Sequence, residues 1–249
     1  MHKNYLISLF CLLITLLFIP CSDAALSLRE NLQKAKTGDF IVAMQNKNYT
    51  LLHIYDKTAD TLTIEEITVP AARMQRMSSW KEWVKQGAPN HTSWILYTIQ
   101  SHTGKMSNCF SVSQRSWLDL SQNEAFLPTL LNLNFTYIPL TERRKIGPPP
   151  SAGTPDMRKY WQPKMVIDGQ VIPNIAFETW RTYWPKDNTP LSGKTIDIYL
   201  PEERHLYSTY FPYWLEIRGS LAGKATVHII DSGSSLISPA PPIPKRNSL

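Results

Sequence analysis

Residues 40–69 read FIVAMQNKNYTLLHIYDKTADTLTIEEITV, and this stretch decides the fold class. Apolar, β-branched and aromatic residues fill three segments, which are separated by two polar clusters. The apolar segments are residues 40–44, 49–55 and 62–69, and the polar clusters are residues 46–48 and 56–60. Residues of the first kind favour strands, whereas Asn and Asp favour turns. The stretch therefore predicts three antiparallel strands joined by short turns.

The same pattern extends along the chain. Asp168-Gly169 stands between MVI and QVI, and this arrangement is typical of a two-residue hairpin turn. Further strands are predicted over residues 94–100, 106–112, 195–200, 213–218 and 225–230. Short helices are predicted over residues 26–36, 78–86 and 124–131 from apolar spacing and capping residues. The fold class is therefore mainly β, with antiparallel meanders and hairpins in a sandwich or open-barrel-like arrangement and a few short helices.

Residues 1–24 have the pattern of a secretory signal peptide. Lys3 precedes an apolar run over residues 5–19, Pro20 breaks the run, and Ser22-Asp23-Ala24 places small residues at the cleavage positions. The run is shorter than the roughly 20 residues of a membrane-spanning helix. We predict cleavage after Ala24, which leaves Ala25 as the first residue, and a location in the periplasm or cell envelope of a bacterium.

Cys21 allows an alternative to cleavage after Ala24, in which the protein is processed as a lipoprotein. A bacterial lipoprotein is cut directly before a cysteine that then carries lipid. The residue before Cys21 is Pro20, whereas such signals favour a small residue at that place. An intact Ala25 amine in the mature protein would reject the lipid anchor.

A punctuated segment over residues 146–163 divides the chain. It contains Pro148, Pro149, Pro150, Pro155 and Pro163, and prolines exclude a central strand. We interpret it as a linker or long surface loop between a β-rich part, residues 25–145, and a second part, residues 164–231. The two parts are expected to pack as one domain. Residues 232–249 are rich in Ser and Pro and predict a disordered tail.

The chain carries a net charge of +6, and the predicted cleavage does not change it because one Lys and one Asp are removed. A basic exported protein favours anionic partners such as lipid, glycan or acidic protein. No nucleic-acid-binding module is recognisable. Basic residues border and occupy the proline-rich segment, which is either a solvated loop or a docking site for an anionic surface. They are Arg143, Arg144, Lys145, Arg158 and Lys159.

No set of residues predicts nucleophilic or metal chemistry. Cys109 is the single cysteine outside the leader, so it has no disulfide partner in the mature chain and is expected to be a small buried residue. His102 would lie roughly 13 Å away along the hairpin, at about 3.3 Å per residue, too far for a Cys–His dyad. The mature histidines do not stand at metal-ligand spacing. They are His53, His91, His102, His205 and His228. No cofactor is predicted.

Residues 229–235 read IIDSGSS and resemble the hydrophobic-Asp-Ser/Thr-Gly signature of aspartic proteases. The resemblance implies a catalytic carboxylate at Asp231 and a homodimer, because two aspartates must share one proton. His228 replaces an apolar residue of the signature, and only a Pro-rich tail follows Ser235. The sequence favours the other interpretation, a strand that ends in an Asp-Ser-Gly turn.

Aromatic residues form two clusters, residues 180–184 and residues 207–214, which predict either core packing or an exposed platform for glycan or lipid. The strand-rich body as a whole resembles uncharacterised exported proteins of obligate intracellular bacteria, and that resemblance implies no activity. We predict an exported, non-catalytic cell-envelope protein that binds or scaffolds an anionic or amphipathic partner. One alternative is a periplasmic lipid or lipoprotein carrier with an apolar cavity, and another is a hydrolase that uses Asp231.

Overall fold

The computed structural model describes residues 25–245 apart from 75–78, 120–125, 208–209 and 221–222. The elements of the first part of the chain are β1 (Ala25–Ser27), α2 (Leu28–Lys34), β2 (Phe40–Gln45), β3 (Asn48–Lys57), β4 (Thr61–Pro70), the 3-10 helix η1 (Ala71–Arg73), α3 (Trp80–Lys85), β5 (Ser93–Gln100), β6 (Met106–Ser111), β7 (Ser116–Trp117), α4 (Phe126–Leu131), β8 (Asn134–Tyr137) and the 3-10 helix η3 (Leu140–Glu142).

The elements described in the second part of the chain are all strands. They are β9 (Met165–Ile167), β10 (Gln170–Ile172), β11 (Phe177–Tyr183), β12 (Thr195–Pro201), β13 (Trp214–Ser220) and β14 (Gly223–Gly233). None of the helices in the described part of the chain combines the length and the hydrophobicity that crossing a bilayer requires.

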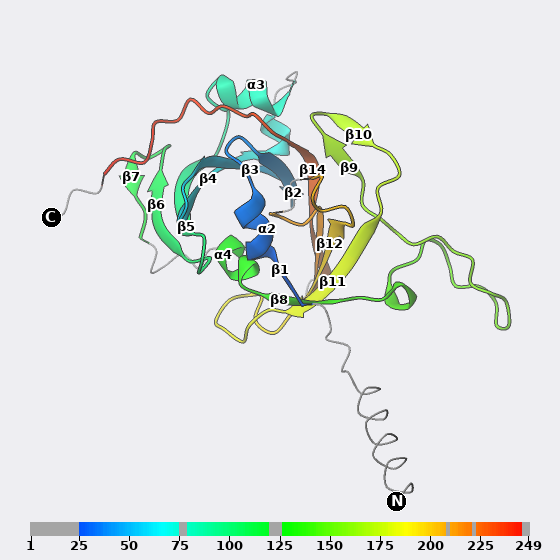
Figure 1. The fold of residues 1–249 in the computed structure, drawn as a ribbon. Coiled ribbons are helices and arrows are strands. Elements are labelled where there is room, and N and C mark those ends of the chain that lie inside the picture. Colours follow the sequence, from blue (N-terminus) through cyan, green and yellow to red (C-terminus); the bar gives the residue numbers. More distant parts are fainter. Residues whose placement is uncertain (1–24, 75–78, 120–125, 208–209, 221–222, 246–249) are drawn as a thin grey trace, which may run out of the picture.

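Twelve strands form one antiparallel sheet in the order β1-β8-β11-β12-β13-β14-β2-β3-β4-β5-β6-β7, and β9 pairs with β10 in a separate hairpin. The predicted fold class, mainly β with a few short helices, is confirmed. Figure 1 shows the sheet curving around α2 and α4. Because β14 pairs with β2 and β8 pairs with β11, strands from both sides of the proline-rich segment share this sheet.

Tight turns form at two of the predicted hairpins. Asn46 and Lys47 have φ values of 48° and 65° and join β2 to β3. Asp168 and Gly169 have φ values of 49° and 77° and join β9 to β10. Positive φ at both turn residues matches the right-handed twist of the strands. These turns fix the register, and a slip of one residue would move every core side chain to the other face.

Four strands of the sheet, β1, β7, β8 and β11, were not predicted. β1 and β8 are short and pair with each other, so the helix predicted over residues 26–36 is confined to Leu28–Lys34. In β11, charged residues hide the apolar pattern. Glu178 pairs with Arg204 at 3.2 Å, and Arg181 pairs with Asp197 of β12 at 2.7 Å. Ion pairs such as these, of which Arg181–Asp197 joins two neighbouring strands, let a half-buried strand carry charge.

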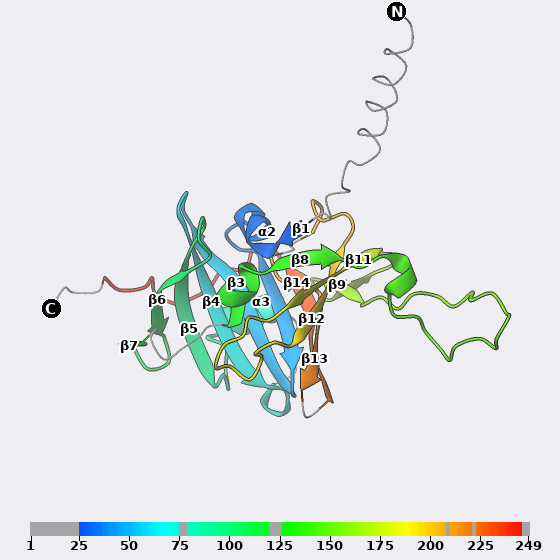
Figure 2. The ribbon, with the colours of Figure 1, turned by 90° about the horizontal axis from the view of Figure 1, so that it is seen from below.

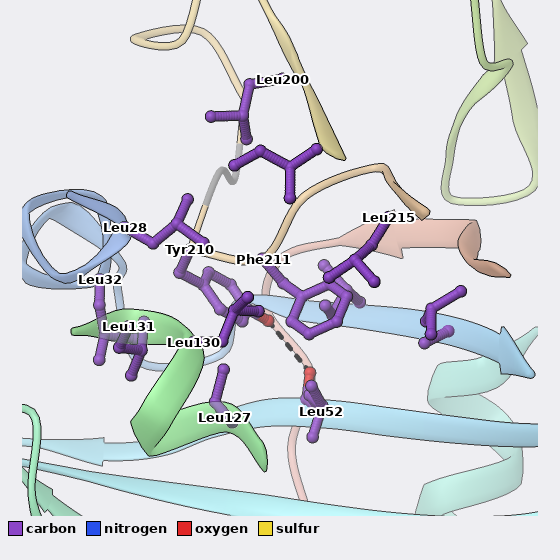
Figure 3. Close-up of a cluster of buried hydrophobic side chains, with 14 of the residues drawn as sticks. Leu28, Leu32, Leu52, Leu127, Leu130, Leu131, Leu200, Tyr210, Phe211 and Leu215 are labelled. Atoms are coloured by element: carbon purple, nitrogen blue, oxygen red, sulfur yellow. Dashed lines mark hydrogen bonds between the residues drawn. The ribbon is translucent and has the colours of Figure 1, made fainter. Parts of the chain in front are cut away.

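The concave face of the sheet holds the larger core. Figure 3 shows leucines of α2 and α4 meeting Tyr210 and Phe211 over the strands. The Tyr210 hydroxyl donates a hydrogen bond to the Leu52 carbonyl of β3 at 3.0 Å, which ties this covering layer to the sheet. Leu28, Leu32 and Tyr210 are fully buried. Burying each leucine contributes about 1.5–3 kcal/mol relative to exposure.

The convex face is also apolar and is covered by α3 and by the C-terminal segment, residues 234–243. Trp83 and Val84 of α3 are fully buried on it. Ser79 caps α3 by accepting a hydrogen bond from the Glu82 backbone N–H at 3.2 Å, as its sequence predicts. In Figure 1 the C-terminal segment, drawn in red, runs across this outer face.

The prediction of a disordered tail over residues 232–249 was wrong for the described residues up to 245. Leu236 and Ala240 are buried, and the Tyr55 hydroxyl donates to the Ala240 carbonyl at 2.9 Å. A Ser/Pro-rich composition disfavours helices and central strands, but it allows an extended segment to pack on an apolar face. The predicted tail residues 246–249 lie outside the described part.

The proline-rich segment leaves the sheet as a long loop, in agreement with the exclusion of a central strand. Lys145 and Tyr160 form an isolated antiparallel bridge, and the Ile146 N–H donates to the Lys159 carbonyl at 2.9 Å. Figures 1 and 2 show the chain between them extending away from the body of the molecule. We call residues 145–160 the projecting arm.

Arg143, at the foot of the arm, is a buried structural residue. Its guanidinium donates to the Ile138 carbonyl at 3.0 Å, to the Phe177 carbonyl at 2.8 Å and to the Tyr137 hydroxyl at 2.6 Å. Arginine suits this role because its planar fork carries five donors. These bonds hold the foot of the arm against β8 and β11.

The packing of the C-terminal segment gives a matched pair of substitutions. Leu236→Ala should lower the free energy of unfolding by about 2–5 kcal/mol, because it opens a cavity in the convex-face core. Ile237→Ala, one residue further and 81% exposed, should change it by less than about 0.5 kcal/mol. Urea titration followed by tryptophan fluorescence measures both. Equal effects would contradict the packing described.

Candidate functional site

The main candidate site is a pocket of about 430 Å³ on the concave face, which we call the concave pocket. Strand alternation brings side chains of β2 to β6 and β14 to this face, and Phe211 and α4 supply the opposite wall. Its lining residues are Ala43, Gln45, Thr50, Leu52, Glu66, Ser93, Ile95, Tyr97, Met106, Cys109, Leu118, Phe126, Leu127, Phe211 and Val227. The lining is therefore mostly apolar.

The polar lining residues gather on neighbouring strands rather than scatter. Glu66 of β4 lies opposite Leu52 and Ile95 in the register, and the next position toward the strand ends brings Thr50 and Ser93 alongside. The pocket thus has an apolar interior and one polar side centred on Glu66. Such a division is typical of sites that hold a mainly apolar ligand and orient it by a few polar contacts.

Glu66 is the ionisable group that dominates the electrostatics of the pocket. Burial raises the pKa of Glu66, and the hydrogen bond that the Tyr97 hydroxyl donates to Oε2 at 3.3 Å lowers it in part. The carboxylate form is therefore held at a cost in free energy. A donor or a positive charge supplied by a ligand would offset that cost.

Cys109 also lines the pocket and is buried, as its sequence predicts. Burial raises the pKa of its thiol to about 11, and the Glu66 carboxylate adds to the shift. The residue is therefore a thiol at neutral pH, and the thiolate is the nucleophilic form. Cys109 lies opposite Tyr97 in the register, and a register shift interrupts the β5–β6 pairing next to Thr98.

Asp231 lies in β14, where it holds the β9–β10 hairpin. Its Oδ1 accepts hydrogen bonds from the backbone N–H groups of Gly169 at 3.1 Å and Ser232 at 2.9 Å. Burial raises the pKa of this carboxyl, and the two backbone donors lower it in part. Asp231 therefore acts here as a structural acceptor between two elements.

The other two residues of the Asp-Ser-Gly motif serve the same junction. The Ser232 hydroxyl donates to the Val166 carbonyl of β9 at 2.9 Å and lies 3.1 Å from the Tyr213 hydroxyl. A Cβ added at Gly233 would lie 2.6 Å from the Phe40 ring and 2.5 Å from an Asp168 carboxylate oxygen. The motif thus has a packing role at each of its three positions.

A buried polar cluster on the convex face was not predicted. The fully buried Glu65 carboxylate lies 2.8 Å from His53 Nδ1, accepts from Trp94 Nε1 at 2.8 Å and accepts from the Ser238 hydroxyl. Ser238 bonds to the carboxylate rather than to the imidazole, so the arrangement differs from a nucleophile–base pair. It fixes the C-terminal segment to the sheet. Alternation and register place His53 opposite Glu65, and this was the available sequence signal.

The aromatic clusters contribute mainly to the core. Trp180, Trp184, Tyr210, Phe211 and Tyr213 are buried, whereas Tyr183 is 67% exposed. Across residues 25–245 without the gaps, no three His, Cys, Asp or Glu side chains come together in a way that could hold a metal ion. Ala24 and Cys21 lie outside the described residues, so signal cleavage and lipidation stay predictions.

Residues 50–173 match the model of a protein family described as CT021 protein. Over that span the chain resembles the CT021 family. The solved structure of the hypothetical protein CT021 from Chlamydia trachomatis, at 2.0 Å resolution, aligns with a TM-score of 0.62 and 19% sequence identity. The alignment covers 89% of this chain and 99% of that chain. No curated protein sequence matches the chain.

At 19% identity the structural likeness shows a shared fold and carries no activity. The comparisons support similarity to an uncharacterised chlamydial protein. They say nothing of export or of the cell envelope, so those parts of the resemblance inferred from the sequence stay predictions.

The structural role of Asp231 can be tested with two variants, one that removes the hydrogen-bond acceptor and one that keeps an acceptor oxygen. Asp231→Ala should destabilise the protein by about 1–3 kcal/mol, because the buried Ser232 N–H and the partly buried Gly169 N–H lose their acceptor. Asp231→Asn keeps an oxygen at the same place and should cost less. Denaturant titration of both variants gives the comparison. An equally large loss in the Asn variant would show that the negative charge, rather than the acceptor, matters.

Glu66→Gln gives a test that depends on pH. Because the folded-state pKa is raised, the native protein binds this proton more tightly than the unfolded chain, and stability falls as pH rises above the ordinary glutamate range. The Gln variant should therefore be more stable than the wild type at pH 7, and the difference should vanish below about pH 4. Thermal unfolding across pH measures it. The exposed Glu142→Gln variant serves as control, and a difference independent of pH would contradict the assignment.

Proposed function

We propose that this protein is an exported, non-catalytic binding protein that carries a small amphipathic molecule in the concave pocket. The observation that carries the proposal is the pocket itself, which combines an apolar interior with a single polar side around Glu66. Of the functions considered from the sequence, a carrier with an apolar cavity fits this geometry best. The export element rests on the signal-like pattern of residues 1–24.

The size of the pocket supports a small ligand. Ligand sites commonly measure about 300–1,000 Å³, and the concave pocket falls toward the lower end of that range at about 430 Å³. Leu52, Ile95 and Val227 offer aliphatic surface from the sheet, while Phe126 and Phe211 offer aromatic surface from the opposite wall. An aliphatic chain or a fused ring system would lose water contact against both.

The polar side determines which head group the pocket favours. A carboxylate acceptor at Glu66, with the side chains of Gln45, Thr50 and Ser93 nearby, favours a head group that donates hydrogen bonds. Hydroxyl, amide and amine groups do so. An anionic head group would add a like charge beside Glu66 and is disfavoured. The pocket therefore suits an amphipathic partner rather than an anionic one.

The chemistry of the pocket also supports a non-catalytic role. The raised pKa of Cys109 leaves it a thiol, so the cysteine in the pocket is not activated. Asp231, the residue of the protease-like motif, is occupied by two backbone donors at the hairpin junction. The interpretation of Asp231 as a strand-end residue is thus the better supported of the two.

A neutral fluorescent probe, N-phenyl-1-naphthylamine, tests the pocket directly. Its emission should rise on addition of the wild-type protein, and Ser93→Trp should weaken its binding about tenfold or more by filling the polar side. Ser116→Trp, at an exposed position on β7 outside the pocket, should leave binding unchanged. Matching unfolding midpoints would show that both variants are folded. Equal loss in both variants, or no binding by the wild type, would overturn the proposal.

Displacement of the same probe by three compounds that share a ten-carbon chain and differ in their head groups tests the polar side of the pocket. Decylamine and 1-decanoylglycerol should compete more strongly than decanoate at pH 7, by about 10–100-fold for the amine. In Glu66→Gln this discrimination should shrink, because the charge that distinguishes the compounds is gone. Equal competition by all three compounds in the wild type would show that Glu66 does not contact the head group.

A further inference from the structure

We infer that the projecting arm, residues 145–160, together with Lys164, docks this protein on the surface of an anionic phospholipid bilayer. This interaction surface lies outside the concave pocket and does not depend on the proposed carrier function. Four features carry the inference: the shape of the arm, its charge, its exposed apolar side chains and its prolines.

The arm is a preformed element. The bridge between Lys145 and Tyr160 closes its base. Asp156 then links the two sides, because it lies 2.9 Å from Lys145 Nζ on the other side, and it also lies 2.9 Å from Arg158 Nε on its own side. Arg158 also donates to the Gly147 carbonyl at 3.0 Å. A surface element held in this way loses little conformational entropy on binding.

Most of the net charge of the chain lies in the arm and in the residues that flank it. Residues 143–164 hold six basic residues and one acidic residue, a net charge of +5, whereas the whole chain has +6. Arg143 is buried against carbonyl groups, and Lys145 and Arg158 share Asp156. Lys159 and Lys164 are exposed and have no acidic partner among the described residues. These two lysines are therefore available to an anionic surface.

Apolar side chains stand exposed beside these charges. Met157 is 88% exposed and Ile146 is 55% exposed. Exposed apolar groups next to Lys and Arg are typical of protein segments that lie in the membrane interface, where the apolar part enters the acyl boundary and the cations meet the head groups. A soluble polyanion would give Met157 and Ile146 no apolar partner. This pairing favours a lipid surface over a glycan.

The prolines reduce the cost of leaving water. Pro148, Pro149, Pro150 and Pro155 have no backbone N–H, so the tip of the arm carries fewer donors that would lose hydrogen bonds near the acyl chains. All four are exposed in the structure.

Vesicle co-sedimentation tests the inference. The protein is expressed from residues 1–249 and purified after any processing by the host cell. Vesicles of phosphatidylcholine are compared with vesicles that also contain phosphatidylglycerol. The wild type should bind the anionic vesicles and show little binding to the neutral ones. The double variant Lys159→Glu/Lys164→Glu should lose about tenfold or more in affinity, since four charge units change at the membrane-facing site.

The matched control is Lys105→Glu/Lys186→Glu, which changes the net charge equally at two exposed lysines away from the arm. It should retain affinity within about threefold. Met157→Ser, which leaves the charge unchanged, should weaken binding to vesicles but not to dextran sulfate. Equal losses in the two double variants would show that net charge alone acts and would overturn the inference. An unchanged Met157→Ser variant would overturn the assignment to lipid.

The outcome is separable from that of the carrier proposal. Ser93→Trp fills the concave pocket and should leave vesicle binding unchanged, while the arm variants should leave probe binding unchanged. Loss of vesicle binding in Ser93→Trp would contradict a docking surface on the arm.

Discussion

The structure depends on one constraint, which is that the central part of the sheet is apolar on both faces. Alternation along β2 to β5 sends Ile41 and Leu52 to the concave core and Val42 and Leu51 to the convex core. A sheet with two apolar faces must be covered twice. Helices α2 and α4 with residues 210–213 cover one side, and α3 with the C-terminal segment covers the other. The pocket remains on the concave face between the strands, α4 and Phe211.

Because both faces of the sheet are covered, the adjacent residues Glu65 and Glu66 place their carboxylates in two different environments. Glu65 points to the convex face, where a histidine, a tryptophan and a serine surround its carboxylate, so it serves as a structural acceptor. Glu66 points to the concave face, where Tyr97 is its hydrogen-bond partner and the rest of its surroundings is a mostly apolar pocket. Because neighbours in a strand face opposite ways, one carboxylate became part of the core and the other became available to a ligand.

Much of the sheet followed from local signals. Alternation and turn chemistry predicted β2 to β6 and the β9–β10 hairpin, since each of these is specified within a few residues. β1, β8 and β11 were not predicted, because partners outside their own segments stabilise them. The pairing of Arg181 with Asp197 is one such contact. The packing of the C-terminal segment on the convex face was not predicted for the same reason. The pocket could not be predicted, because it depends on how six strands and one helix converge.

The sequence places a cluster of basic residues in and beside the proline-rich segment, and the structure shows this segment as an arm that projects from the sheet. Residues 143–164 hold a net +5 and the remaining residues together hold +1. Arg143 ties the foot of this segment to β8 and β11 through three hydrogen bonds, so the charged arm has a fixed root in the sheet. The carboxylate of Glu66 lies in a pocket with no part of its lining from this segment. The acidic group of the pocket and the basic residues of the arm therefore lie in separate parts of the molecule.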